Sequence, residues 1–172
     1  MLSLGLGLRR GGGAGAVLGP RYWRIHVDLV FGQYYAAGYR PMITEIEFRD
    51  SIGGTDLTAS ADAVEKSIAE ADGNSDLRSH LAFDNSGSVA NSWFRDQTPG
   101  DQTSWVGWDF GPAGANIVEV HMLCNYSAQP DRNGHPQAFR LQSADDTAGP
   151  WTDVLTVTGL SQWVNWEWRT FN

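Results

Sequence analysis

The segment YWRIHVDLVF, residues 22–31, alternates apolar and polar side chains over most of its length. Its apolar side chains are Trp23, Ile25, Val27 and Leu29. The polar ones between them are Arg24, His26 and Asp28. Successive side chains of a β-strand point to opposite faces of its sheet. The segment therefore predicts a strand with one face in a core and the other in water.

The same alternation recurs along the chain. In ITEIEFRD, residues 43–50, Ile46 and Phe48 are expected inward, with Glu45, Glu47 and Arg49 outward. Further strands are expected at 105–110, 117–124, 139–144, 151–157 and 162–171, separated by turn residues. Only residues 60–72 have helical spacing. About seven or eight short strands predict an all-β fold, an antiparallel β-sandwich.

The closing strand, residues 162–171, is rich in tryptophan and can be divided by alternation into two faces. The face expected in the core consists of Val164, Trp166 and Trp168. The opposite face consists of Trp163, Asn165, Glu167 and Arg169. Trp163 has two interpretations at this point, an exposed platform for a sugar ring or a packing contact at the sandwich edge.

The charge balance restricts the possible partners. Twelve Lys and Arg against twenty Asp and Glu give a net charge of −8. Nucleic acids and anionic membrane surfaces are bound by clustered cations, so both are excluded as expected partners. A divalent cation or a neutral sugar suits such a surface better. Eight Trp, seven Phe and five Tyr exceed what one core needs and favour exposed aromatic side chains for binding.

Residues 1–20 form a glycine-rich arm that differs in composition from residues 21–172, the expected β-sandwich domain. Leu2, Leu4, Leu6 and Leu8 alternate with Ser and Gly, which predicts an extended arm that docks onto neighbouring subunits. A flexible tail is the alternative. The arginines follow the apolar run, so no signal peptide is expected. No run approaches the roughly 18 apolar residues of a membrane span. The single Cys124 is expected to pack as a small hydrophobic residue.

A family resemblance rests on the order of several motifs. AFDNSGSVANSW (82–93) is followed by WVGWDFG (105–111), IVEVHML (117–123) and HPQAFRLQSADDTAGPWTDVLTV (135–157), and then by a closing strand that contains Glu167. Together these resemble a discoidin domain, also called the coagulation-factor C-type domain. That family overlaps with galactose-binding-like carbohydrate-binding modules. The resemblance covers residues 21–172 and implies an eight-stranded jelly-roll sandwich.

The resemblance also implies a structural calcium ion. The matching ligands are Asp84, Ser86 and Asn91 in the loop after residue 82, with Glu167 from the closing strand. Calcium takes about six to eight oxygen ligands, which a tight loop of small polar residues can supply. The flanking Phe83 and Trp93 would then anchor this loop in the core. The alternative is an acidic turn without metal, in which Asp84 caps backbone N–H groups.

A candidate sugar site lies in the loop at residues 125–137. Sugars are held by aromatic faces and by hydrogen bonds from charged or amide side chains. The predicted ligand-binding residues are Tyr126, Asp131, Arg132, Asn133, His135 and Trp163. A solvated connection without ligand is the alternative interpretation of the loop.

No catalytic motif for hydrolysis, phosphoryl transfer or zinc chemistry occurs in the sequence. The expected function is therefore non-catalytic. It is that of a phage virion protein (tail, fibre or head-decoration component) whose sandwich attaches to cell-surface glycans. Residues 1–20 would contact other virion proteins during assembly in the host cytoplasm, and a homo-oligomer is expected because multivalency strengthens weak sugar binding. The alternatives are a purely structural decoration protein and a stand-alone bacterial lectin.

Overall fold

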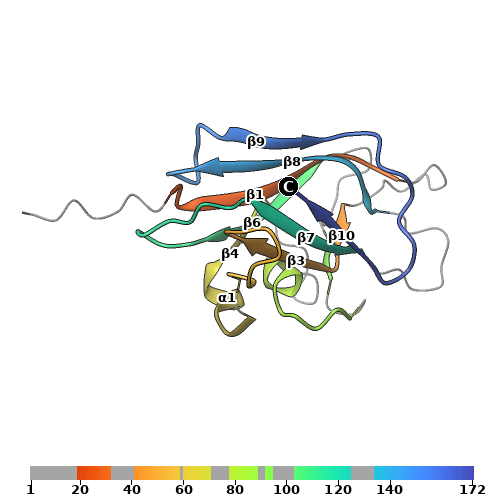
Figure 1. The fold of residues 1–172 in the computed structure, drawn as a ribbon, viewed down its shortest axis with the longest axis horizontal. Helices are drawn as coiled ribbons and strands as arrows, with labels where there is room; N and C mark the ends of the chain where they lie inside the picture. Colours follow the sequence, from red (N-terminus) through yellow and green to blue (C-terminus); the bar gives the residue numbers. More distant parts are fainter. Residues whose placement is uncertain are drawn as a thin grey trace, which may run out of the picture.

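Five strands form the larger sheet of the structure, a computed structural model that describes residues 19–31, 41–58, 60–70, 78–88, 92–94, 103–124 and 134–172. Their order is β4-β6-β1-β8-β9, and every pairing is antiparallel. The bounds are β1 Tyr22–Val30, β4 Ser67–Ala69, β6 Ser104–Asp109, β8 Pro136–Ala144 and β9 Thr152–Val157. Figure 1 shows β9, β8 and β1 along the upper side of the molecule.

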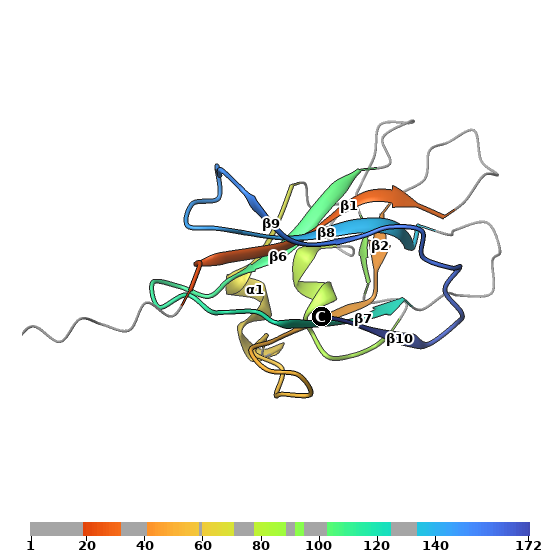
Figure 2. The ribbon, with the colours of Figure 1, turned by 45° about the horizontal axis from the view of Figure 1, so that its top comes forward.

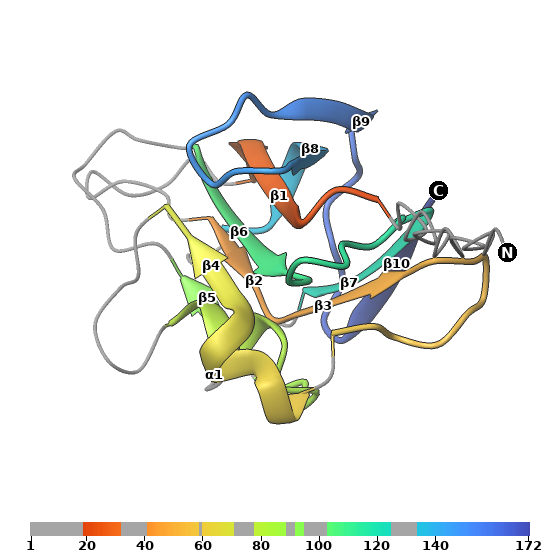
Figure 3. The same ribbon diagram turned by 90° about the vertical axis from the view of Figure 1, so that its left-hand side faces the viewer.

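The second sheet has three antiparallel strands in the order β10-β7-β3. They are β3 Glu45–Arg49, β7 Glu119–Cys124 and β10 Glu167–Phe171. A small pair joins β2 Met42–Ile43 to β5 Trp93–Phe94. Figures 2 and 3 show the two larger sheets on opposite sides of the domain. The predicted all-β, antiparallel sandwich class is thus confirmed, whereas the eight-stranded jelly-roll topology stays a prediction.

The core lies between the sheets, and its largest fully buried side chains are aromatic. Phe83 contacts Phe48 and Trp108, with ring centroids 6.0 and 5.0 Å apart respectively. Trp93 and Cys124 are fully buried, which confirms both as core residues. Because each buried aromatic side chain removes a large apolar area from water, these rings carry much of the stability.

Strand β1 follows the predicted alternation only as far as Val27. Trp23, Ile25 and Val27 are buried, but Leu29 is 39% exposed and Val30 is buried in its place. The pairing of β1 with β8 shifts register on both sides of Leu29. A bulge inserts an extra residue and reverses the alternation beyond it, so the predicted inward position of Leu29 was wrong.

The expected helix at residues 60–72 is mostly absent among the residues described there. The 3-10 turn η1 (Ser60–Asp62) leads into the short helix α1 (Ala63–Lys66), and the chain then enters strand β4. Another 3-10 turn, η2, spans Ser79–Ala82. The β4 segment pairs with β6, whose backbone groups need partners. Sheet pairing has overridden a weak helical propensity here. None of the helices in the described parts is long and apolar enough to cross a membrane.

The closing strand has the opposite orientation to the one predicted. Val164, Trp166 and Trp168 are 65%, 58% and 45% exposed, so their assignment to the core was wrong. Trp163 is buried instead, and Phe171 packs edge-on against Phe139 at 4.9 Å. Strand β10 begins only at Glu167, after Trp166 adopts a φ of 61°. Val164, Trp166 and Trp168 are exposed together, so only the choice of the inward face was wrong, because alternation does not show which of two tryptophan-bearing faces is buried.

Candidate functional site

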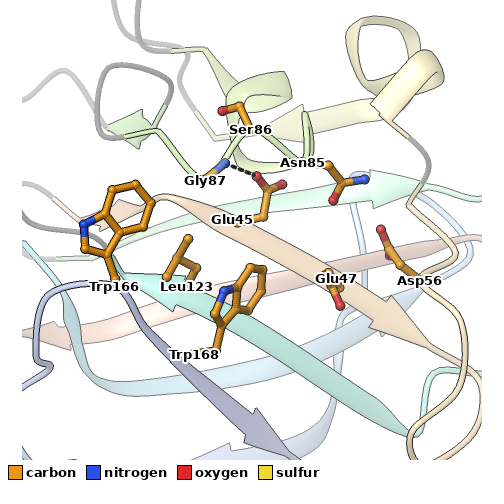
Figure 4. A pocket seen from close by; sticks show the side chains of 9 residues that line it. All are labelled: Glu45, Glu47, Asp56, Asn85, Ser86, Gly87, Leu123, Trp166 and Trp168. Carbon is orange, nitrogen blue, oxygen red and sulfur yellow. Dashed lines mark hydrogen bonds between the residues drawn. The ribbon is translucent and has the colours of Figure 1, made fainter.

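An open hollow of about 450 Å³ lies on the outer side of the three-stranded sheet (Figure 4). Strands β3, β7 and β10 contribute to it, together with the loop after η2 and the segment before β10. We call it the Glu45 hollow, and its lining residues are Glu45, Glu47, Asp56, Asn85, Ser86, Gly87, Leu123, Trp166 and Trp168.

Strand register explains why these side chains meet. Glu45 is opposite Leu123 on β7, and Leu123 is opposite Trp168 on β10. Directly opposed residues in a sheet project to the same face. The three side chains therefore form one row across the outer face. The next row consists of Glu47, His121 and Thr170.

The loop after η2 closes one side of the hollow. The Asp84 Oδ1 accepts a hydrogen bond from the Ser86 backbone N–H at 2.9 Å, and Asn85 and Gly87 both have positive φ values, 56° and 58°. A side-chain carbon on Gly87 would lie 3.4 Å from Leu123 Cδ2 and 3.6 Å from Trp166 Cζ3. These are ordinary contact distances, so it is the positive φ at residue 87, and not a lack of space, that favours glycine there.

Glu45 is the most unusual side chain of the hollow. Only 1% of it is exposed, and its Oε1 has no hydrogen-bond partner. Its Oε2 accepts a long hydrogen bond from the Gly87 N–H at 3.4 Å (Figure 4). The pKa of Glu45 is raised to about 8, chiefly by burial and also by the nearby carboxylates of Asp84 and Asp56, against the lowering effect of the backbone N–H groups of Asn85 and Gly87. A buried carboxylate without a cation favours its neutral form.

Asp56 supplies a second buried oxygen without a partner. Its Oδ1 accepts hydrogen bonds from the backbone N–H and the hydroxyl of Thr58, at 2.8 and 2.5 Å. Its Oδ2 is buried and has no hydrogen-bond partner. The loop after β3 therefore fixes this carboxylate at the hollow through one oxygen only.

The nearest cation is already engaged by other acidic groups. Arg49 forms a salt bridge with Glu47 through Nη2, and its Nη1 lies 3.4 Å from Glu119 Oε1. His121 Nε2 lies 3.0 Å from the same Glu119 oxygen. Within the described parts of the chain, no salt bridge reaches Glu45 or Asp56. The hollow is thus acidic and incompletely neutralised.

The predicted calcium ligands do not come together as expected. Asp84 caps Ser86, as in the metal-free alternative. Glu167 does not line the hollow with Ser86: both its oxygens accept hydrogen bonds from Arg169, and Oε2 also accepts one from the Val164 N–H. Asn91 lies outside the described residues. Among those described, no three His, Cys, Asp or Glu side chains are grouped to hold a metal ion. This arrangement does not fit an ion shared by Ser86 and Glu167, and calcium binding stays a prediction.

The predicted sugar-binding residues fall into two groups. Tyr126, Asp131, Arg132 and Asn133 lie outside the described residues. His135 and Trp163 are brought together, with ring centroids 6.5 Å apart, but both are buried. The Trp163 Nε1 donates to the Pro136 carbonyl at 2.8 Å, and the Arg169 guanidinium stacks over its ring at 4.2 Å. In this structure Trp163 is therefore an edge-packing residue and not an exposed platform.

Sequence reasoning missed the two exposed indoles, and it named Glu45 only as an outward-facing strand residue. The repeated Trp in WVNWEWR was a signal for Trp166 and Trp168, but the face was assigned the wrong way round. The sequence did single out the loop at residues 84–87, as part of a calcium site or an acidic turn.

Comparisons with protein-family models, with curated proteins and with solved structures found no match to this chain.

Proposed function

We propose that this protein binds carbohydrate without catalysis, through the Glu45 hollow. The observation that carries the proposal is the pair of exposed indoles, Trp166 and Trp168, beside a buried carboxylate with an unused oxygen. Indole faces pack against the apolar faces of sugar rings, while carboxylates and amides hold the hydroxyl groups. Glu45, Asp56 and Asn85 supply such groups from the same hollow.

Exposure of the two indoles is costly unless something covers them. Large aromatic side chains on a protein surface commonly mark binding sites. Trp166 also adopts a left-handed backbone conformation, which side-chain-bearing residues rarely do. A ligand that covers both rings accounts for the exposure and for the retained strain.

The test is glycan binding by the full chain and by three variants, W166A, W168A and V154A. Val154 is 49% exposed on β9, belongs to the other sheet and serves as the matched control. Loss of one stacking ring should weaken binding by about tenfold, while V154A should bind like the unmodified protein. If no glycan binds, or if W168A binds unchanged, the proposal is refuted.

The wider role is also a proposal. A phage virion protein that attaches to host surface glycans would combine this hollow with an assembly arm at residues 1–20, and a jelly-roll sandwich remains the topology implied by the discoidin resemblance. Deleting residues 1–20 should then abolish incorporation into particles without changing glycan binding. Incorporation of the truncated protein would refute the assembly role of residues 1–20, whereas a full chain that never enters particles would favour a lectin that acts alone.

A further inference from the structure

The hydrogen-bonding groups of the Glu45 hollow are unequally divided between acceptors and donors. Glu45, Glu47 and Asp56 present carboxylates, which only accept hydrogen bonds when ionised. Two of their oxygens, Glu45 Oε1 and Asp56 Oδ2, are buried and have no hydrogen-bond partner. A neutral sugar hydroxyl both donates and accepts, whereas an ammonium group only donates. A ligand with surplus donors complements this hollow best.

The charges point the same way. Arg49 is shared between Glu47 and Glu119, and no salt bridge from the described residues neutralises Glu45 or Asp56. The carboxylate of Asp84 adds to the negative potential at Glu45. A cation that entered the hollow would therefore gain attraction from several carboxylates at once.

The two indoles distinguish an organic cation from a metal ion. Trp166 and Trp168 line the same hollow as the carboxylates and remain exposed. Tryptophan faces attract ammonium groups through their π-electrons, and they also pack against sugar rings. A divalent metal ion would need about six or more oxygen ligands and would make no use of either ring.

We propose that the Glu45 hollow selects saccharides that carry a protonated primary amine, such as a hexosamine without its acetyl group. The inference rests on the proposed carbohydrate binding and adds the class of sugar. In it, Trp166 and Trp168 pack against the ring and attract the ammonium. The positive charge of the ammonium also favours the ionised form of Glu45, so that the carboxylates of Asp56 and Glu45 both stabilise it.

The experiment compares two ligands that differ only in the amine. The full chain is titrated calorimetrically with an oligosaccharide of N-acetylglucosamine and with its fully deacetylated counterpart, at about pH 6, where a primary amine is protonated. A short lysine peptide supplies amines without sugar, and a panel of neutral glycans supplies sugar without amines. Each titration is repeated with a chelator and at about 0.5 M NaCl, where charge interactions are screened.

The expected result is binding of the deacetylated oligosaccharide at least about tenfold tighter than of the acetylated one, the combined effect of one cation–π contact and one partly screened ion pair. Salt should weaken this preference, and the chelator should not change it. Equal binding of both oligosaccharides, or tighter binding of a neutral glycan, overturns the amine inference but leaves carbohydrate binding intact. Binding to no glycan overturns both. Equal binding of the lysine peptide shows general cation attraction and overturns carbohydrate binding.

Variants connect the preference to the hollow. D56N removes a charge while keeping the Thr58 contacts possible, and E45Q removes the buried acid. Both should lower the preference for the amine, taken as the ratio of the affinities for the two oligosaccharides, about tenfold or less. E65Q is the control, because Glu65 is exposed on α1 and does not line the hollow. Unchanged selectivity in D56N and E45Q, or binding lost on chelation, refutes the assignment.

Discussion

Replacing Glu45 by glutamine should stabilise the protein at alkaline pH and leave its stability nearly unchanged in acid. The folded state raises the pKa of Glu45 from 4.5 to about 8, chiefly because the carboxyl group is buried. A carboxyl with a raised folded-state pKa contributes fully to stability below its unfolded pKa. That contribution is lost as the pH rises from 4.5 through about 8. Glutamine has a similar shape and does not ionise, so E45Q should escape the loss.

The size of the effect follows from the two pKa values. The interval between 4.5 and about 8 corresponds to a loss of roughly 5 kcal/mol of unfolding free energy when Glu45 ionises in a site that does not relax. If the site relaxes, the loss should be roughly 3 kcal/mol. For a domain of this length the difference in melting temperature is on the order of 10 °C. It should develop between about pH 5 and about pH 9.

The assay is urea unfolding of the unmodified protein and E45Q across this pH range, with E65Q as the control. Other titrating groups affect all three proteins equally, so the difference between their unfolding free energies isolates Glu45. The E45Q advantage should increase with pH, whereas E65Q should follow the unmodified protein. Parallel curves for E45Q and the unmodified protein would show that Glu45 ionises with an ordinary pKa, and the reasoning about its burial would fail.

Three further changes test the core, the loop after η2 and an ion pair of the larger sheet. F83A should cost about 3–5 kcal/mol in urea unfolding because it leaves a cavity beside the buried Trp108, and a cost below about 1 kcal/mol would contradict the core assignment. G87A should lower the melting temperature and weaken glycan binding, since its φ is 58°; unchanged binding would show that this loop does not shape the site. The hydrogen bond from Arg21 lowers the pKa of Asp109. The stability that this carboxylate contributes is therefore present above its ordinary pKa and is lost as the pH falls. D109N should be less stable than the unmodified protein at neutral pH but not in strong acid, as an acid titration of both proteins would show.

Part of the fold could be predicted because strands β1 and β3 bury mainly one face. In β1 and β3, polar and apolar side chains alternate, so Ile25 and Ile46 could be placed in the core. Leu29 could not, because a bulge depends on how β1 pairs with β8, a strand more than a hundred residues away in sequence. Residues 67–69 likewise read as helix until β6 is present to pair with them.

The candidate site was less predictable for a related reason. Alternation shows which residues share a face but not which face is buried, and in WVNWEWR both faces carry tryptophan. Glu45 meets Gly87 only through tertiary folding, since about forty residues separate them.

Three unfavourable features coincide at the Glu45 hollow, and their coincidence is itself an argument for function. Asn85 and Trp166, the two non-glycine residues with positive φ in the described parts of the chain, both line it. Each left-handed residue costs about 1 kcal/mol, and the buried carboxyl of Glu45 adds its own cost whenever it ionises. Strain and perturbed pKa values gather where a binding site must be preorganised. A surface that served only to hold the sandwich together would gain stability by losing all three features, so their presence in one place favours a ligand over a purely structural role.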